Sequence, residues 1–498
     1  MSPVYLALTF LTLLSLLLLL RRRRPSPPLP PGPLGLPIVG SLPFLDLQLH
    51  SYFAKLARTH GPILSLRLGT KLAVVVTSPA LSKEVLRNND QIFANRDVPV
   101  AARAATYGGF DIVWTPYGPE WRMLRKVCVR DLLAGKSLES VYELRRREVR
   151  RTIGYLKDRA GSPVNVGEQM FLTILNVITG MLWGGTVRGE DREKVGAEFR
   201  QLVAELTALL GMPNVSDFFP ALAKWDLKGV LKRMRKCAGK FDKIFEQLID
   251  QRMRMAGDEI EERDFLQILL KLKDDGDANP PMTMIHVKAL LMDMVTGGTD
   301  TTSNSVEFAM AEMMKHPEVM KKAQLELDSV IGHDRPVEES DIRKLPYLLM
   351  VLKETLRLHP LLPLLIPHCP SQPSTIGGYT IPEGSRVFIN VWAIHRDPTI
   401  WADPNRFDPE RSSSNGYDFS GNEFTYFPFG SGRRICAGME MAERMFLFSL
   451  ASLLHSFNWR FPEGEQLDVE EEFGIVMKKK TPLVVIPIPR LSNAALYE

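Results

Sequence analysis

A ten-residue stretch near the C-terminus, Phe-Gly-Ser-Gly-Arg-Arg-Ile-Cys-Ala-Gly at residues 429–438, constrains the fold more than any other part of the sequence. Gly430, Gly432 and Gly438 have no side chain, so the backbone around them can approach a flat ligand closely. Backbone N–H groups in such a turn can hydrogen-bond a thiolate at Cys436 and tune its potential. The stretch therefore indicates a loop that holds a flat ligand against a sulfur atom.

Two further side chains set Cys436 apart from the other cysteines. Arg434 adds a cation that could pair with a carboxylate of the ligand, and Phe429 supplies an aromatic wall that keeps water off the sulfur. A plain glycine-rich turn before a helix would not explain why these residues occur together. The remaining cysteines form no C-x-x-C pair, which argues against a zinc site or a disulfide scaffold and fits a reducing compartment. We interpret them as small buried hydrophobic residues: Cys128, Cys237 and Cys369.

The N-terminus has the pattern of a membrane anchor. Val4 to Leu20 is a run of 17 residues without charge, and four arginines, Arg21 to Arg24, follow at once. A helix of that length spans roughly 26 Å, the lower limit for crossing a bilayer. A cleaved signal peptide, the alternative, would carry its charges before the apolar run and a small-residue cleavage site after it. We therefore predict an uncleaved anchor with a basic stop-transfer at residues 1–24, with the arginines on the cytosolic side.

The stretch that follows the anchor, residues 25–40, is dense in proline. Proline forbids a helix and favours extended polyproline geometry. These residues are therefore predicted to form a stiff hinge between the anchor and a body at residues 41–498.

Hydrophobic periodicity predicts that the body is mainly helical, with a small β region. Residues 80–355 show a mostly helical pattern, and a further helix is expected at 438–456. Strand patterns occur in four places: Ile63 to Leu68, Leu72 to Val76, Thr375 to Val391 and Leu483 to Ile488.

The stretch at 429–438 resembles the haem-binding signature of the cytochrome P-450 superfamily, F-x-x-G-x-R-x-C-x-G, at every fixed position. The resemblance implies a single triangular, mainly helical haem-thiolate fold, with haem b as cofactor and Cys436 as the ligand of the iron. It also implies that four other residues of the stretch bind haem: Phe429, Gly430, Arg434 and Gly438.

A second motif of this family lies in residues 353–357, Lys-Glu-Thr-Leu-Arg. By themselves Glu354 and Arg357, three positions apart on a helix, would be an ordinary surface pair. The family has an E-x-x-R pair that contacts the arginine of a later P-E-R-F loop, and Pro-Glu-Arg occurs here at 409–411. The resemblance therefore implies a structural triad of Glu354, Arg357 and Arg411, although Ser412 stands where the family has phenylalanine.

A cluster of small polar residues, Gly-Gly-Thr-Asp-Thr at 297–301, interrupts an apolar helical run from Ala289 to Met310. Such a cluster is unfavourable inside a helix, and a kink needed for packing is one interpretation. The resemblance implies instead that the glycines open a groove for dioxygen. Thr301 would donate a hydrogen bond above the iron and Asp300 would relay protons. This pair favours an oxygen-activating enzyme over relatives that rearrange hydroperoxides.

Three more residues match family positions that contact the haem propionates. Trp121 and Arg125 match a W-x-x-x-R helix, and His368, in Ile-Pro-His, matches a strand position.

The order of the motifs, together with Ala-Ile-His-Arg-Asp-Pro at 393–398, resembles plant microsomal members, with weaker similarity to terpenoid and flavonoid hydroxylases. This implies a single-pass protein of the endoplasmic reticulum membrane with a cytosolic catalytic domain. No G-x-G-x-x-G follows a strand, so electrons from NADPH are expected to arrive through a separate flavin reductase. A net charge of +4 is too mild to indicate nucleic acid.

The expected reaction is insertion of one oxygen atom from dioxygen into a small lipophilic molecule. The alternative is a membrane-tethered haem protein that binds or senses a ligand without turnover. The resemblance places the pocket walls at 101–114, 206–219, 361–366 and 473–477, whose apolar character suits a small hydrophobic guest.

Overall fold

The computed structural model describes residues 27–184, 190–254, 264–276, 278–412, 416–464 and 467–498. The predicted anchor at 1–24 lies outside these residues.

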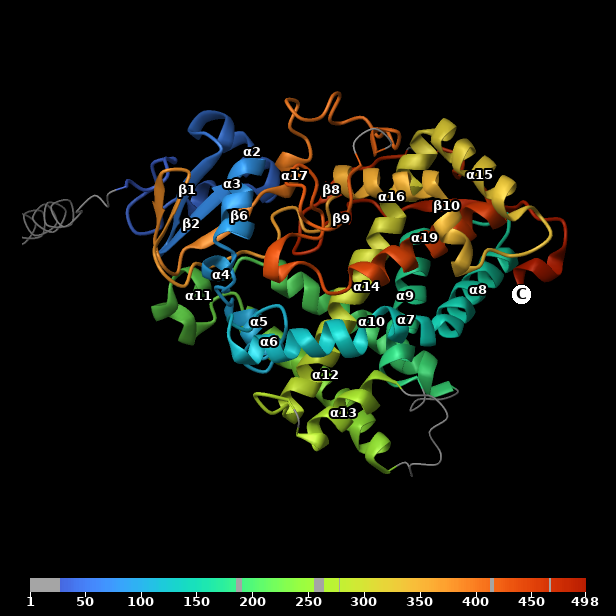
Figure 1. Cartoon of the computed structure of the whole chain (residues 1–498), viewed down its shortest axis with the longest axis horizontal. Coiled ribbons are helices and arrows are strands. Elements are labelled where there is room, and N and C mark those ends of the chain that lie inside the picture. Colours follow the sequence, from blue (N-terminus) through green and yellow to red (C-terminus); the bar gives the residue numbers. More distant parts are fainter. Residues whose placement is uncertain (1–26, 185–189, 255–263, 277, 413–415, 465–466) are drawn as a thin grey trace, which may run out of the picture.

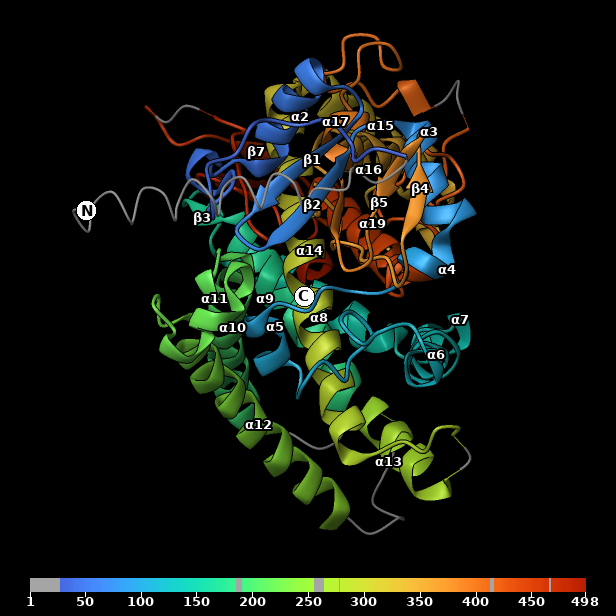
Figure 2. The same ribbon diagram turned by 90° about the vertical axis from the view of Figure 1, so that its left-hand side faces the viewer.

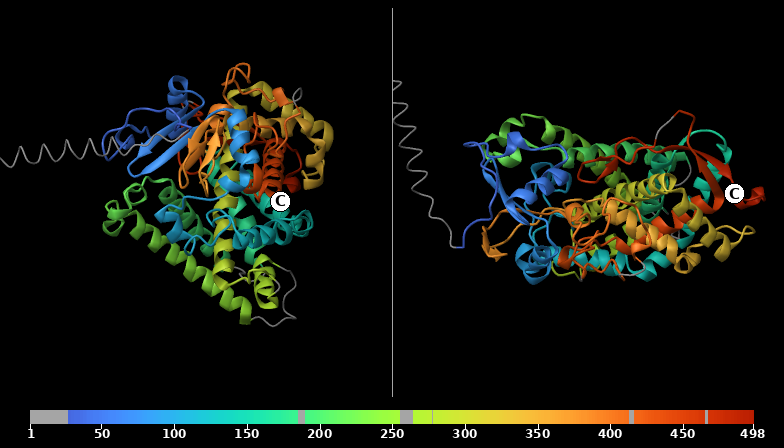
Figure 3. Two further views of the ribbon diagram at one scale, coloured as in Figure 1. Left: turned by 60° about the vertical axis from the view of Figure 1, so that its left-hand side comes forward. Right: turned by 90° about the horizontal axis from the view of Figure 1, so that it is seen from above.

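The fold is organised around one long helix, α14 (Met284–Lys315), of 32 residues or about 48 Å. It begins at a capping box made by Thr283 and His286. Helix α9 (Val166–Trp183) packs along it, and α19 (Met439–Ser456) lies beside it (Figures 1 and 3). Most side chains of α14 are buried, as expected for a helix that is apolar around most of its circumference.

Other helices surround α14 and form a body that narrows towards α12 and α13 (Figure 2). They are α2 (Leu49–His60), α3 (Pro79–Lys83), α4 (Asp90–Phe93), α5 (Val100–Ala105), α6 (Pro119–Lys126), α7 (Gly135–Ser140), α8 (Tyr142–Asp158), α10 (Glu190–Gly211), α11 (Val215–Phe218), α12 (Val230–Arg254), α13 (Phe265–Asp275), α15 (Pro317–Ile331), α16 (Pro346–Leu358) and α17 (Val391–Ile394).

Small sheets lie at the edge of the helical body. The strands predicted at 63–68 and 72–76 are confirmed: β1 (Ile63–Leu68) pairs antiparallel with β2 (Lys71–Val76), and β6 (Arg386–Ile389) joins β2 in parallel. A second sheet has the order β3 (Val164–Asn165), β10 (Val484–Pro489), β7 (Phe457–Arg460). Two-stranded ladders complete the described sheets: β4 (Ser374–Ile376) with β5 (Tyr379–Ile381), and β8 (Glu471–Glu472) with β9 (Lys478–Lys479). The prediction of a mainly helical fold with a small β region is therefore confirmed.

The described part of the proline-rich stretch lies against the sheet of β1 and β2. The backbone N–H of Ser65 donates to the carbonyl of Pro31 at 2.8 Å, and its hydroxyl donates to Pro30 at 2.7 Å. Thr380 donates to the carbonyl of Pro27 at 2.6 Å. The extended segment is thus held by the body rather than projecting freely from it.

Among the described residues, α9 alone is long and apolar enough to cross a bilayer by length and composition. Its side chains are mostly buried, and it packs against α14. It is a core helix of the body.

The contact between α9 and α14 gives a prediction from two adjacent glycines. A Cβ added at Gly298 would lie 2.9 Å from Cδ1 of Ile178 in α9, whereas one added at Gly297 would meet no atom within 4 Å. We expect Gly298→Ala to force the buried Ile178 side chain out of its place and to cost about 1 kcal/mol, the lower end of the range for overpacking. Gly297→Ala should keep or raise stability, because alanine favours a helix by about 1 kcal/mol. Thermal unfolding of both variants checks this, and equal melting temperatures would contradict it.

Candidate functional site

The loop before α19 is shaped by glycines that other residues could not replace. Gly430 and Gly432 have φ angles of 78° and 68°, in the region that favours glycine. A Cβ on Gly432 would lie 2.1 Å from the carbonyl oxygen of Leu86. The N–H of Cys436 donates to the carbonyl of Phe429 at 3.0 Å and closes the loop.

Cys436 is deep in the protein and yet open. Its side chain is exposed, whereas the other three cysteines are buried. Burial nevertheless raises the pKa of its thiol, while the backbone N–H of Gly438 and the charge of Arg125 act in the opposite direction. Protein therefore surrounds the Cys436 sulfur but does not cover it, and we interpret this sulfur as part of the wall of an interior hollow.

The middle of α14 is open in the same way. Gly297 is exposed within a mostly buried helix, its neighbours Thr296 and Gly298 are partly exposed, and so is Thr301, one turn later. A Cβ added at Gly297 or at Gly438 would meet no atom within 4 Å. Because α14 packs against α19, which begins directly after the Cys436 loop, we interpret these positions as two walls of one hollow.

Arg434 is fixed on the side of this hollow that faces residues 94–121. It donates to the carbonyls of Ala94 at 2.7 Å, Ile112 at 3.0 Å and Thr115 at 2.5 Å. Its guanidinium lies 4.5 Å from the ring centroid of Trp121, whose Nε1 also donates to Ile112 at 3.0 Å. Burial lowers the pKa of Arg434 to about 10, so it still carries its charge at neutral pH.

A second arginine, Arg96, joins this group and was not predicted. It donates to the carbonyls of Ile366 at 2.7 Å and Pro367 at 3.0 Å. Burial lowers its pKa, and the charge of Arg434 lowers it further, which places the two cations close together. The sequence around Arg96 matches no motif, so only the tertiary structure could assign it to the site.

His368 also lies here, but as a neutral group. Its Nδ1 is 2.9 Å from the carbonyl of Phe93, and its backbone bridges to Val387. Burial lowers the pKa of His368 well below its usual value, and the charges of Arg96 and Arg434 add to the effect. Nδ1–H therefore donates to Phe93, and the ring offers no positive charge to an anion.

The group of cations fits haem. Arg125 has neither a hydrogen-bond nor an ion-pair partner among the described residues, and its charge acts on both Cys436 and Arg434. Burial raises the pKa of the nearby acid Asp111 to about 6, and a single carboxylate cannot balance the charges of Arg96, Arg125 and Arg434. Buried cations require anions, and the two propionates of haem supply them beside a cysteine sulfur. The described residues contain no group of three His, Cys, Asp or Glu that could hold a metal without such a macrocycle.

The structure places Thr301 and Asp300 on different sides of α14. The Thr301 hydroxyl donates to the carbonyl of Gly297 at 2.9 Å. In this arrangement the hydroxyl proton points to Gly297 and the oxygen offers lone pairs that can accept a hydrogen bond. The donation from Thr301 above the iron stays a prediction. Asp300 is buried, and its Oδ2 lies 3.3 Å from Nζ of Lys478 on β9. Adjacent helical residues do not face each other, so a water molecule would be needed to connect the two side chains.

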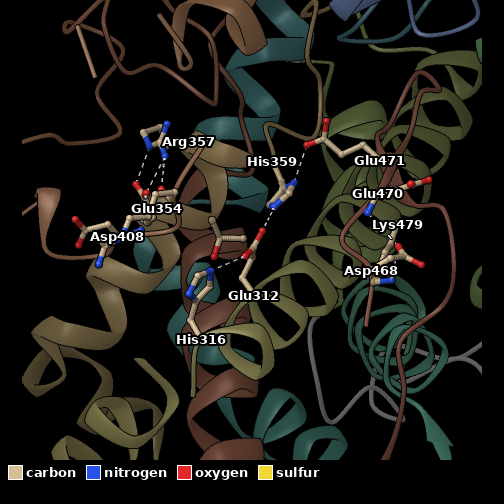
Figure 4. Close-up of polar contacts among 12 residues, drawn as sticks. Glu312, His316, Glu354, Arg357, His359, Asp408, Asp468, Glu470, Glu471 and Lys479 are labelled. Carbon is tan, nitrogen blue, oxygen red and sulfur yellow. Dashed lines mark hydrogen bonds and ion pairs between the residues drawn. The ribbon is translucent and has the colours of Figure 1, made fainter. Parts of the chain in front are cut away.

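Two of the predicted triad residues, Glu354 and Arg357, lie together near Asp408 (Figure 4). Glu354 and Arg357 are each 1% exposed and form two parallel hydrogen bonds of 2.7 and 2.8 Å. Nε of Arg411 lies 3.4 Å from Glu354, and the N–H of Asp408 donates to Glu354 at 2.9 Å. Arg357 also donates to the carbonyls of three residues of the following segment: His395, Pro404 and Arg406.

Comparison with known proteins gives one consistent result. A family model described as Cytochrome P450 matches residues 30–486. Geraniol 8-hydroxylase of Catharanthus roseus is 41% identical over 461 residues, covering 92% of this chain and 93% of the relative. Flavonoid 3'-monooxygenase of Arabidopsis thaliana is 40% identical over 471 residues, with coverage of 93% and 91%. A solved zebra fish cytochrome P450 structure with progesterone aligns with a TM-score of 0.79 at 27% identity, covering 89% of this chain and all of that one.

The buried ion pair of the triad yields a prediction. Glu354→Ala or Arg357→Ala leaves the partner charge buried and uncompensated, which costs roughly 3–5 kcal/mol. Both variants should therefore yield little haem-containing protein. Haem content per polypeptide after expression is the measurement. Normal haem content in both variants would mean that the pair does not support the fold.

Proposed function

Because the chain belongs to the cytochrome P450 family and is a haem b-dependent monooxygenase, we propose that Cys436 is the thiolate ligand of its iron. The observation that carries this proposal is the open Cys436 side chain inside the protein, close enough to Arg125 for that cation to lower the pKa of its thiol. The other three cysteines are buried by protein and cannot reach a haem. The thiolate-bound haem supplies activation of dioxygen.

Five side chains are proposed to hold the haem edge. Arg125, Arg434 and Arg96 balance the propionate charges, and the Trp121 ring backs the guanidinium of Arg434. Neutral His368 contributes Nε2, since its Nδ1 is bound to Phe93. Gly430 and Gly438 leave room for the haem ring. Phe429, whose ring centroid lies 5.2 Å from that of Phe419, shields the sulfur.

Thr301 and Asp300 are proposed to manage protons on the α14 side of the hollow. Because the Thr301 hydroxyl donates to the carbonyl of Gly297, its oxygen can accept a hydrogen bond and so hold a proton donor, such as water, in the hollow. Asp300 and partly exposed Lys478 form the connection between this part of α14 and solvent.

The proposed substrate is a small lipophilic terpenoid or flavonoid. The relatives with about 40% identity are named for geraniol and flavonoids, and both classes are mostly apolar. Contacts between three of the four predicted pocket walls support this proposal: the N–H of Met477 donates to Leu361 at 2.7 Å, and Gly211 approaches Ile475. These segments are rich in apolar side chains, as a site for such a molecule requires.

The setting of the enzyme follows from its family and its N-terminal sequence. A P450 monooxygenase takes electrons from a redox partner, and we propose that this partner is an NADPH-dependent flavin reductase. Residues 1–24 are proposed to anchor the chain in the endoplasmic reticulum membrane, with residues 25–40 as hinge and 41–498 as the cytosolic domain. The monooxygenase relatives favour this enzyme over a haem protein that only binds or senses a ligand.

The iron ligand is tested by cysteine replacement. Cys436→Ser should give protein without the thiolate-type Soret band of the reduced carbon monoxide complex, because the sulfur donor is lost. Cys128→Ser, Cys237→Ser and Cys369→Ser are the matched controls and should retain this band. A Cys436→Ser protein that kept the band would overturn the assignment.

The role of Thr301 is tested by Thr301→Val, which keeps the β-branched shape and removes the hydroxyl. The variant should bind haem and carbon monoxide normally and still consume NADPH with the reductase. It should release more hydrogen peroxide and less product, because the proton donor is no longer held in place. Product formed per NADPH oxidised is the measurement. An unchanged ratio of product to NADPH in Thr301→Val would exclude the threonine from the reaction.

The role of Asp300 is tested by Asp300→Asn, which should slow turnover by about 10²–10⁴-fold because it removes a group that supplies protons.

A further inference from the structure

A second buried charged network lies around His359, the residue directly after α16 (Figure 4). Its Nε2 is 2.8 Å from Glu312 on α14, and its Nδ1 is 2.6 Å from Glu471 on β8. A neutral imidazole has only one N–H, so one of these contacts would set a lone pair against a carboxylate. Both contacts are satisfied only when His359 is an imidazolium. Although burial opposes it, hydrogen bonds to the two glutamates raise the pKa of His359.

Glu471 receives more contacts than any other carboxylate of this network. Besides His359, its carboxylate accepts from Arg396 at 3.1 Å and from Nε1 of Trp392 at 2.9 Å. Burial alone would raise its pKa, but the charges of Arg396 and His359 lower the pKa of Glu471 to about 2. With Glu312 as the second anion, two negative and two positive charges balance inside the protein.

This network stands at the base of a hairpin with very short strands. Strands β8 and β9 have two residues each, pairing Glu471 with Lys479 and Glu472 with Lys478. The five residues between them, 473–477, are one of the predicted pocket walls. A ladder of two pairs is too short to fix such a loop by itself. The position of the loop must therefore depend on contacts outside the ladder.

Those contacts lead from the network to the pocket. Phe308 of α14 stacks on the His359 ring at 4.3 Å. Phe308 also packs with Leu361, Val476 and Met477 in one buried apolar cluster. The hairpin is thus attached to α14 at two points. Glu471 of β8 contacts His359, which in turn contacts Glu312 of α14, and Lys478 of β9 pairs with Asp300 of α14.

From this geometry we propose that Glu471 is a positioning residue for substrate specificity. Its carboxylate, held by His359, Arg396 and Trp392, sets the distance between the 473–477 wall and the wall that begins at Leu361. It touches neither haem nor substrate. The inference rests on the proposed function, because it assumes that these segments enclose the guest above the haem.

The test is Glu471→Gln in the full-length, haem-loaded enzyme. The amide is nearly the same size, but its NH2 must face either the Trp392 donor or the His359 and Arg396 donors, so one contact becomes donor against donor. Glu472→Gln is the matched control: the same substitution one residue away, on an exposed side chain without a hydrogen bond or ion pair among the described residues. Two azoles are the probes. Imidazole needs only the iron, whereas clotrimazole, with three phenyl rings, also needs the pocket walls.

We expect Glu471→Gln to weaken clotrimazole binding by about tenfold or more while imidazole binding stays unchanged. Glu472→Gln should bind both azoles like the wild type. A Glu471→Gln enzyme with less haem or a lower melting temperature but an unchanged ratio of the two affinities would show a merely structural role and overturn the inference. If this variant does not take up haem, Trp392→Phe removes one hydrogen bond to Glu471 and should change the same ratio in the same direction, and an unchanged ratio there also overturns it. Failure of the wild type to give an imidazole spectrum would instead refute the proposed function.

Discussion

The buried ion pair between Glu354 and Arg357 is the interaction on which the arrangement of the site depends. The guanidinium of Arg357 also donates hydrogen bonds to the backbone carbonyls of His395, Pro404 and Arg406. Glu354 accepts from the N–H of Asp408. One pair of side chains in α16 thereby fixes a long irregular segment that helices and strands leave unsupported. The Cys436 loop follows this segment in the chain.

The residue directly after α16 holds a second part of the structure in place. His359 follows the helix directly and connects α14 to the hairpin of β8 and β9 through Glu312 and Glu471. The triad therefore supports the side of the molecule that carries the thiolate, and the His359 network supports the side that carries a pocket wall. The Glu354–Arg357 pair of the triad and the His359 network are both buried and charge-balanced, and removing one member of either leaves an uncompensated charge. Such networks hold irregular backbone in place where apolar contacts would permit sliding.

The cations around the hollow differ from these balanced networks. Arg125 lowers the pKa of Arg434, and Arg434 lowers the pKa of Arg96, while Asp111 offers the three cations a single carboxylate. The described part of the chain does not by itself balance these charges. Haem propionates would complete the balance, which links haem binding to the stability of this region.

Much of this protein could be predicted from the sequence because the determining signals are local. The run of apolar residues around 297–301 identifies α14, alternation identifies β1 and β2, and the glycines of 429–438 specify a loop through their own φ angles. Tertiary structure alone decided which distant groups meet. It brought Arg96 to Arg434, committed the Thr301 proton to Gly297, turned Asp300 towards Lys478, and surrounded His359 with two glutamates. Hydrogen bonds and charge–charge contacts depend on distances of a few ångströms between segments, and these distances are set by the packing of the whole body around α14, which no local pattern encodes.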